Sequence, residues 1–115
     1  MKPNELAKAI AGILDDKKAQ DITAIHTTEQ TIISDYFVIA SGTSSTHVKA
    51  LADELEFGMK ERHGLPPKGI EGRATGWVLL DYGTVLVHIF QKEQREYYNI
   101  ERLWEDAERL ELNLN

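Results

Sequence analysis

The sequence of 115 residues contains no cysteine. This absence excludes a disulfide framework, a thiolate zinc site, an iron–sulfur cluster and a cysteine nucleophile. No apolar stretch approaches the roughly 18 residues that a membrane span requires, and no signal peptide opens the chain. We therefore expect a cytoplasmic protein that has no contact with membranes.

Basic side chains are also scarce. Thirteen lysines and arginines stand against 19 aspartates and glutamates, which gives a formal net charge of −6. Nucleic-acid backbones require clustered Lys and Arg, so no dedicated binding of nucleic acid is expected. An acidic domain is better suited to a basic surface on another protein.

Motifs for metal or nucleotide chemistry are missing. The four histidines, His26, His47, His63 and His88, have neither i,i+4 nor His-x-His spacing, so they predict no metal site. The loop 42–45 lacks a Walker lysine and a GxGxxG run, and helix capping explains its residue types. Asp81 has no second aspartate to form a magnesium-binding pair. We expect no cofactor and no catalytic residues, with a divergent magnesium-dependent nucleotidyltransferase as the alternative.

The length suits a single domain over residues 1–115. Apolar spacing predicts helices over about 4–16, from about Val48 to the stop at Gly64, and over about 95–111. Strands are expected at 22–27, 36–41, 69–72, 77–80 and 85–90, with a turn at 28–33. The order αββαβββα predicts an α/β (α+β) fold, in which a mixed sheet of about five strands is flanked by helices. A right-handed crossover through the second helix is expected to supply a parallel pair.

The last two strands predict a hairpin with two distinct faces. If Tyr82-Gly83 is a two-residue turn, Trp77 lies opposite His88 and Leu79 opposite Leu86. One face is then purely aliphatic, with Val78, Leu80, Val85, Val87 and Ile89. The mixed face carries Trp77, Leu79, Leu86, His88 and Phe90.

Two interpretations of the mixed face are open. Its large and partly polar side chains are typical of surfaces that bind another protein. Alternatively, helices cover both faces of the sheet; Trp77 is then ordinary core, and His88 is a buried histidine with a local hydrogen-bond partner. A three-residue turn would exchange the faces. The third helix is expected to bury Tyr97, Ile100, Leu103, Trp104, Ala107 and Leu110, and to leave Tyr98 exposed.

Four segments together resemble a known family. They are SDYFVIASGTSSTHVKALADELE from Ser34, IEG from Ile70, GWVLLDYGTVLVHIF from Gly76 and REYYNIERLW from Arg95. With the DDKKAQDI segment from Asp15, they closely resemble the ribosomal silencing factor family, also called the Iojap family. The resemblance implies a nucleotidyltransferase-like topology without that enzyme activity.

The resemblance also implies a function. Members of the family bind the large ribosomal subunit through its ribosomal protein fourteen, on the face that meets the small subunit. They thereby prevent subunit joining and lower translation when nutrients are scarce. They are commonly homodimers in isolation. A role in assembly of the large subunit, at the same place, is the alternative.

On this sequence, the resemblance places the binding site on the mixed face and its edges. Trp77 and Leu79 are the expected apolar anchors, and Asp81 is the expected acidic partner of a lysine or arginine. The surrounding contacts are expected from Tyr82, His88, Phe90 and Tyr98.

Overall fold

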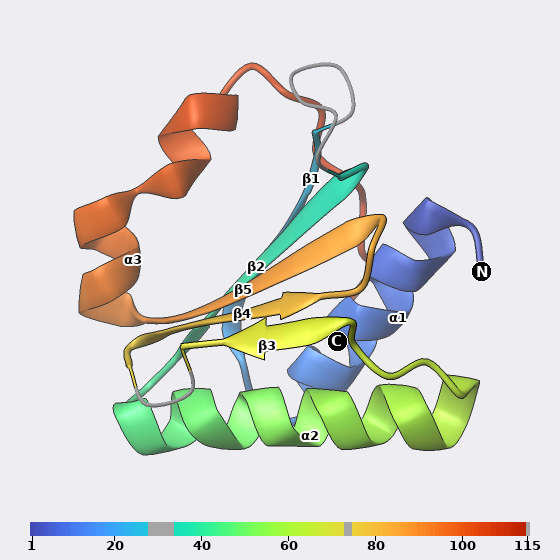
Figure 1. The fold of residues 1–115 in the computed structure, drawn as a ribbon. Helices are drawn as coiled ribbons and strands as arrows, with labels where there is room; N and C mark the ends of the chain where they lie inside the picture. Colours follow the sequence, from blue (N-terminus) through green and yellow to red (C-terminus); the bar gives the residue numbers. More distant parts are fainter. Residues whose placement is uncertain (28–33, 73–74, 115) are drawn as a thin grey trace.

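The computed structural model describes residues 1–27, 34–72 and 75–114 (Figure 1). The turn expected at 28–33 lies outside these ranges. The helices are α1 (Pro3–Asp16), α2 (Ser45–His63), α3 (Lys92–Tyr98) and the 3₁₀ helix η1 (Ile100–Trp104). The strands are β1 (Gln20–His26), β2 (Tyr36–Gly42), β3 (Gly69–Glu71), β4 (Trp77–Asp81) and β5 (Val85–Gln91). The predicted order of elements is confirmed.

The strands form one mixed sheet in the order β1-β2-β5-β4-β3. β2 and β5 run parallel at its centre, and the other three neighbouring pairs are antiparallel. Between β2 and β5 the chain passes through α2, β3 and β4 (Figure 1). The expected mixed sheet of about five strands, with a parallel pair, is therefore confirmed.

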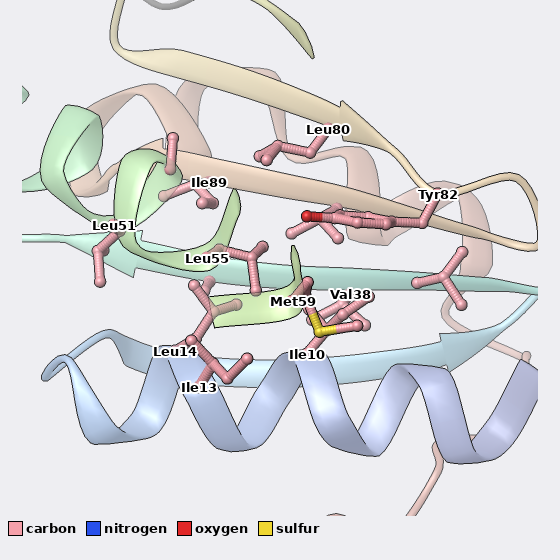
Figure 2. Packing of buried hydrophobic residues seen from close by; sticks show 14 of the residues in the cluster. Ile10, Ile13, Leu14, Val38, Leu51, Leu55, Met59, Leu80, Tyr82 and Ile89 are labelled. Carbon is pink, nitrogen blue, oxygen red and sulfur yellow. The ribbon is translucent and has the colours of Figure 1, made fainter. Parts of the chain in front are cut away.

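The larger core lies between the sheet and the helices α1 and α2. Apolar side chains from α1, α2 and the aliphatic face of the hairpin meet there (Figure 2). Ile10 and Leu14 of α1 and Leu51, Leu55 and Met59 of α2 are fully or almost fully buried. Burial of this apolar area is the main source of stability for a domain without disulfides.

The ends of α2 follow directly from local sequence. The Ser44 side chain accepts a hydrogen bond of 3.1 Å from the His47 backbone N–H, which satisfies one free donor of the first turn. Gly64 ends the helix in the left-handed conformation, with φ of 64°. The capping explanation for the serine-rich loop is therefore confirmed, as is the stop at Gly64.

The hairpin has the predicted faces but a different register. Trp77 pairs with Phe90, and Leu79 pairs with His88, so the predicted partners are wrong. The turn comprises Gly83 and Thr84, because the Tyr82 N–H donates to the Val85 carbonyl across 2.9 Å, and Gly83 has a positive φ of 85°. Moving a two-residue turn by one position shifts the partners by two residues and leaves every side chain on its predicted face.

The predicted third helix is wrong beyond Tyr98. α3 ends at Tyr98; its C-cap Asn99 adopts a left-handed φ of 45°, and the chain continues as η1. Asparagine tolerates this conformation better than most residues. Residues 108–110 then pair with the outer edge of β1: Arg109 bridges Ile25, and the Leu110 N–H donates to the Ala24 carbonyl across 2.9 Å.

The segment 92–107 covers part of the other face of the sheet (Figure 1). A smaller cluster lies beneath it, formed by Ile25, Phe37, Ile39 and Phe90 and flanked by half-buried Trp77, Leu86, Ile100, Trp104 and Ala107. Helices and turns therefore lie against both faces of the sheet. Within the described ranges, no helix is both long and apolar enough to cross a membrane.

Close packing where β2 meets α2 gives a stability prediction. A Cβ atom on Gly42 would lie 2.9 Å from Val48 Cγ2 and 3.0 Å from the Val48 backbone nitrogen. We expect Gly42→Ala to lower the free energy of unfolding by about 1–3 kcal/mol, because the backbone must move apart. Denaturant titration followed by circular dichroism measures the change.

The matched control is Gly12→Ala in α1, where a Cβ atom meets nothing within 4 Å. Alanine there should raise the free energy of unfolding by about 0.5–1 kcal/mol, because alanine favours helix over glycine. Changes of the same sign at both positions would contradict the packing explanation.

Candidate protein-binding surface

Trp77 joins the buried cluster to the exposed surface. It is the first residue of β4, and its indole is half-buried. The indole N–H donates to His88 Nδ1 across 3.1 Å, and the ring stacks on Phe90 with centroids 4.8 Å apart. The centroid of the Tyr98 ring lies 4.9 Å from that of the indole, so Trp77 lies between the β5 strand and α3.

His88 is buried, with 6 % of its surface exposed. Because Nδ1 accepts the hydrogen bond from Trp77, the neutral ring carries its proton on Nε2. Burial lowers the pKa of His88 from its ordinary 6.5 to about 4, so the ring is neutral at pH 7. The structure thus confirms the interpretation of His88 as a buried histidine with a local partner, and His88 is not the surface contact that was expected.

Phe90 and Tyr82 are not surface contacts either. Phe90 is fully buried under the segment 92–107. Tyr82 lies on the aliphatic side of the hairpin, and its ring packs among the side chains of the larger core (Figure 2). Burial, and secondarily the nearby Glu56 carboxylate, raises the pKa of Tyr82 well above its ordinary value. Placing Tyr82 on the binding face was wrong because its position in the hairpin points it to the opposite side.

A ladder of rings leads from Trp77 to the surface. Tyr98, which is 50 % exposed, contacts Trp77, and Tyr97 packs edge-on against Tyr98 with centroids 5.1 Å apart. Tyr97 is 81 % exposed, and Leu103 on η1 is 73 % exposed, so their predicted burial is wrong. We define the aromatic ladder as Trp77, Tyr97 and Tyr98.

The predicted residues do not form one compact site. Leu79 and Asp81 are half-buried on β4, as is Trp77, but Asp81 ends the strand that Trp77 begins. At the rise of an extended strand, the two lie about 13 Å apart. Asp81 Oδ1 accepts the Gly83 N–H across 2.7 Å, so its carboxylate also supports the turn. Trp77 and Tyr98 meet at one end, and Asp81 stands at the other.

The prediction buries Tyr97 and Leu103 because it treats residues 95–111 as one continuous helix. The apolar spacing through Tyr97, Ile100 and Trp104 suits one long helix, but the turn at Asn99 rotates the two parts relative to each other. The adjacent tyrosines predict only that one of the two rings is exposed, and the prediction already assigned that place to Tyr98; exposure of Tyr97 as well follows from the break at Asn99.

The described residues offer no evident place for a metal ion. Among them, no group of three or more His, Asp or Glu side chains is arranged to hold one. A surface cavity of about 510 Å³ lies at the α1–β1 connection and is lined by Asp15, Asp16, Lys18, Ala19 and Gln20, none of which belongs to the aromatic ladder. What the ladder can do chemically is bury aromatic area against another surface.

The pKa of His88 predicts how stability depends on pH. The folded pKa of about 4 lies below the unfolded value of 6.5, so the unfolded chain binds an extra proton between these values. The free energy of unfolding is therefore highest above pH 6.5 and falls as the pH drops towards 4. Between pH 7 and pH 4, the free energy of unfolding of the wild type should fall by roughly 3 kcal/mol more than that of His88→Gln.

The measurement is urea denaturation of both proteins across this pH range. Glutamine is a matched control, because its amide oxygen can accept the Trp77 N–H while its side chain does not titrate. If the free energies of unfolding of the two proteins change in parallel with pH, burial of a neutral His88 does not cause the loss of stability at low pH.

Comparison with known proteins places these features in a family. A family model described as "Ribosomal silencing factor during starvation" matches residues 1–115. A ribosomal silencing factor of Halalkalibacterium halodurans is 41 % identical over 113 residues, covering 97 % of this chain and 96 % of that protein. A mouse protein named "Mitochondrial assembly of ribosomal large subunit protein 1" is 35 % identical over 98 residues, covering 83 % of this chain and 43 % of that protein.

A solved structure agrees. The crystal structure of a Chromobacterium violaceum protein superimposes with a TM-score of 0.87 and 34 % identity, covering all of this chain and 95 % of that one. The fold and the sequence match over the same full length. The chain therefore belongs to the family of ribosomal silencing factors.

Proposed function

We propose that this chain represses translation by binding the large ribosomal subunit and blocking its joining with the small subunit, mainly under nutrient limitation. The match of the family model over residues 1–115 carries this proposal. The name of the Halalkalibacterium halodurans relative supports a silencing role, and the name of the mouse relative supports an association with the large subunit. The proposed site of action is the cytoplasm, where no catalytic step is required.

The aromatic ladder is the proposed contact with ribosomal protein fourteen of the large subunit. Tyr97 and Tyr98 present aromatic area to solvent, and such side chains dominate the binding energy of protein interfaces. Leu79 and Asp81 extend this surface along β4. His88 and Phe90 support Trp77 from below, through the hydrogen bond and the ring stack.

Charge favours a protein partner within the ribosome. The net charge of −6 repels RNA phosphates, so favourable contact is confined to a basic protein patch. The segment that carries the tyrosines is itself rich in carboxylates, including Glu93, Glu96 and Glu105. Complementary charge would then speed association and select the orientation of docking.

Steric exclusion is the proposed mechanism. The folded body measures 34 × 34 × 28 Å. An interface of roughly 800 Å² per partner is sufficient to hold such a body in place. A domain of this size on the joining face keeps the two subunits apart without any chemical step.

A second function at the same site is assembly of the large subunit. The name of the mouse relative favours an assembly role. The two functions differ in timing, because an assembly factor binds immature particles and a silencing factor binds mature ones. Self-association into a homodimer is part of the main proposal, with the exposed aromatic ladder or the short edge strand β3 as the surface that a second copy would use.

The ladder predicts a loss of binding on truncation of one ring. We expect Tyr98→Ala to weaken binding to purified large subunits by about 30-fold, as for a hot-spot aromatic residue, and to relieve inhibition of subunit joining. Phe57→Ala is the matched control, because Phe57 is 64 % exposed on α2, against the opposite face of the sheet. Co-sedimentation and a joining assay with mature subunits measure both effects.

If Tyr98→Ala binds and inhibits as well as Phe57→Ala, the ladder is not the contact. Binding to immature particles alone would favour assembly over silencing. Binding to the small subunit alone would overturn the proposed function.

Asp81 gives an independent test of charge. Asp81→Asn keeps an oxygen that accepts the Gly83 N–H, whereas Asp81→Lys also reverses the charge. We expect about a fivefold loss of affinity with asparagine and a much larger loss with lysine. Both losses should be smaller at high salt, because salt screens the charge. Equal affinities for wild type and Asp81→Asn at low salt would remove Asp81 from the proposed contact.

A further inference from the structure

The Arg95 guanidinium joins four elements of the fold. Nη1 donates to the Asp21 carbonyl of β1 across 2.7 Å and to Ser41 Oγ of β2 across 2.8 Å. Nε and Nη2 donate to the two carboxylate oxygens of Glu101 on η1, across 2.8 and 3.2 Å. A single side chain of α3 thereby holds η1 and two strands together.

The surroundings make this an effective tether. The Arg95 side chain is only 12 % exposed and Ser41 is almost fully buried, so water competes little for the hydrogen bond between them. Glu101 is 27 % exposed, and the bond to the Asp21 carbonyl lies at the surface. The paired contact with Glu101 matches the planar fork of a guanidinium, which lysine cannot reproduce. Asp21 lies at the irregular part of β1 with a left-handed φ of 50°, a conformation that persists only when its surroundings hold it.

α3 depends on such tethers for its orientation. It has seven residues, none of them buried, and no side-chain N-cap. A helix this short is not stable alone in water. Its start is fastened by the Gln91 N–H, which donates to the Gly76 carbonyl across 2.8 Å, and Arg95 fastens its next turn.

Arg95 lies three residues before Tyr98. Residues at this spacing occupy the same side of a helix, so the face that Arg95 draws towards the sheet also carries the Tyr98 ring. That ring contacts Trp77 at 4.9 Å, and Tyr97 packs against Tyr98. Rotation of α3 would separate Tyr98 from Trp77 and turn both tyrosines away.

We propose that Arg95 is a positioning residue, which fastens α3 to the β1–β2 side of the sheet and thereby holds Tyr98 against Trp77 in the binding-competent arrangement. This inference rests on the proposed function for its consequence in binding. Arg95 itself does not contact the ribosome. Of the five N–H donors of a guanidinium, four are engaged within this chain.

The first experiment uses the free protein. Nuclear Overhauser contacts between the Tyr98 and Trp77 rings are compared in wild type, Arg95→Lys and Arg62→Lys. Arg62 is a matched control, because it is half-exposed on α2 and pairs at the surface with Asp16. We expect Arg95→Lys to lose the ring contacts while the methyl signals of Val38, in the larger core, stay unchanged. Retained ring contacts in Arg95→Lys would overturn the proposal.

The second experiment is a double-mutant cycle for binding to large ribosomal subunits. We expect Arg95→Lys to weaken binding about tenfold in the wild-type background. It should have almost no effect when Tyr98 is already alanine, because Arg95 acts on binding through Tyr98. Equal losses in both backgrounds would overturn the positioning role. If Arg95→Lys does not fold, Glu101→Gln, which keeps Arg95 but removes the paired charge, takes its place in both experiments.

The two experiments separate this inference from the proposed function. Loss of the ring contacts together with unchanged binding of Tyr98→Ala would remove the ladder as the ribosomal contact, and would leave Arg95 as the residue that orients α3. Ring contacts that stay intact in Arg95→Lys, together with weak binding of Tyr98→Ala, would remove Arg95 as the residue that orients α3 and would leave the ladder as the ribosomal contact.

Discussion

The contact on which the binding surface depends is that of the Trp77 indole with its neighbours. On its sheet side, the indole donates a hydrogen bond to His88 and stacks on Phe90; on its α3 side, it contacts the Tyr98 ring. The indole therefore links the mostly buried strand β5 to the mostly exposed helix α3. Burial keeps His88 neutral, and only the neutral ring has a nitrogen free to accept this hydrogen bond. A buried histidine thus orients a partly exposed aromatic ring.

Local sequence patterns predict most of this fold. The apolar spacing around Leu51 and Leu55 and the serine and glycine at the ends of α2 are all short-range signals, and the structure agrees with each. The faces of the hairpin were also predictable, because alternation along a strand does not depend on where a two-residue turn begins. Its register was not predictable, since Tyr82-Gly83 and Gly83-Thr84 both satisfy the turn.

The candidate surface was less predictable because tertiary contacts decide it. The break at Asn99 is set by a single backbone angle, while the apolar spacing on its two sides is compatible with one helix. Burial of Phe90 depends on the segment 92–107, which the sequence alone cannot place over the sheet. The partners of Arg95 come from β1, β2 and η1, so no local motif identifies that side chain as a tether.

The parallel pairing of β2 with β5 has a consequence for the order in which the molecule is made. These strands form the centre of the sheet, yet α2, β3 and β4 separate them along the chain. Closing so long a loop costs entropy before any contact compensates for it, which slows folding. During synthesis, α1, β1 and β2 emerge well before their central neighbour exists. Until β5 leaves the ribosome, one side of β2 stays without a partner and is open to association with other nascent chains.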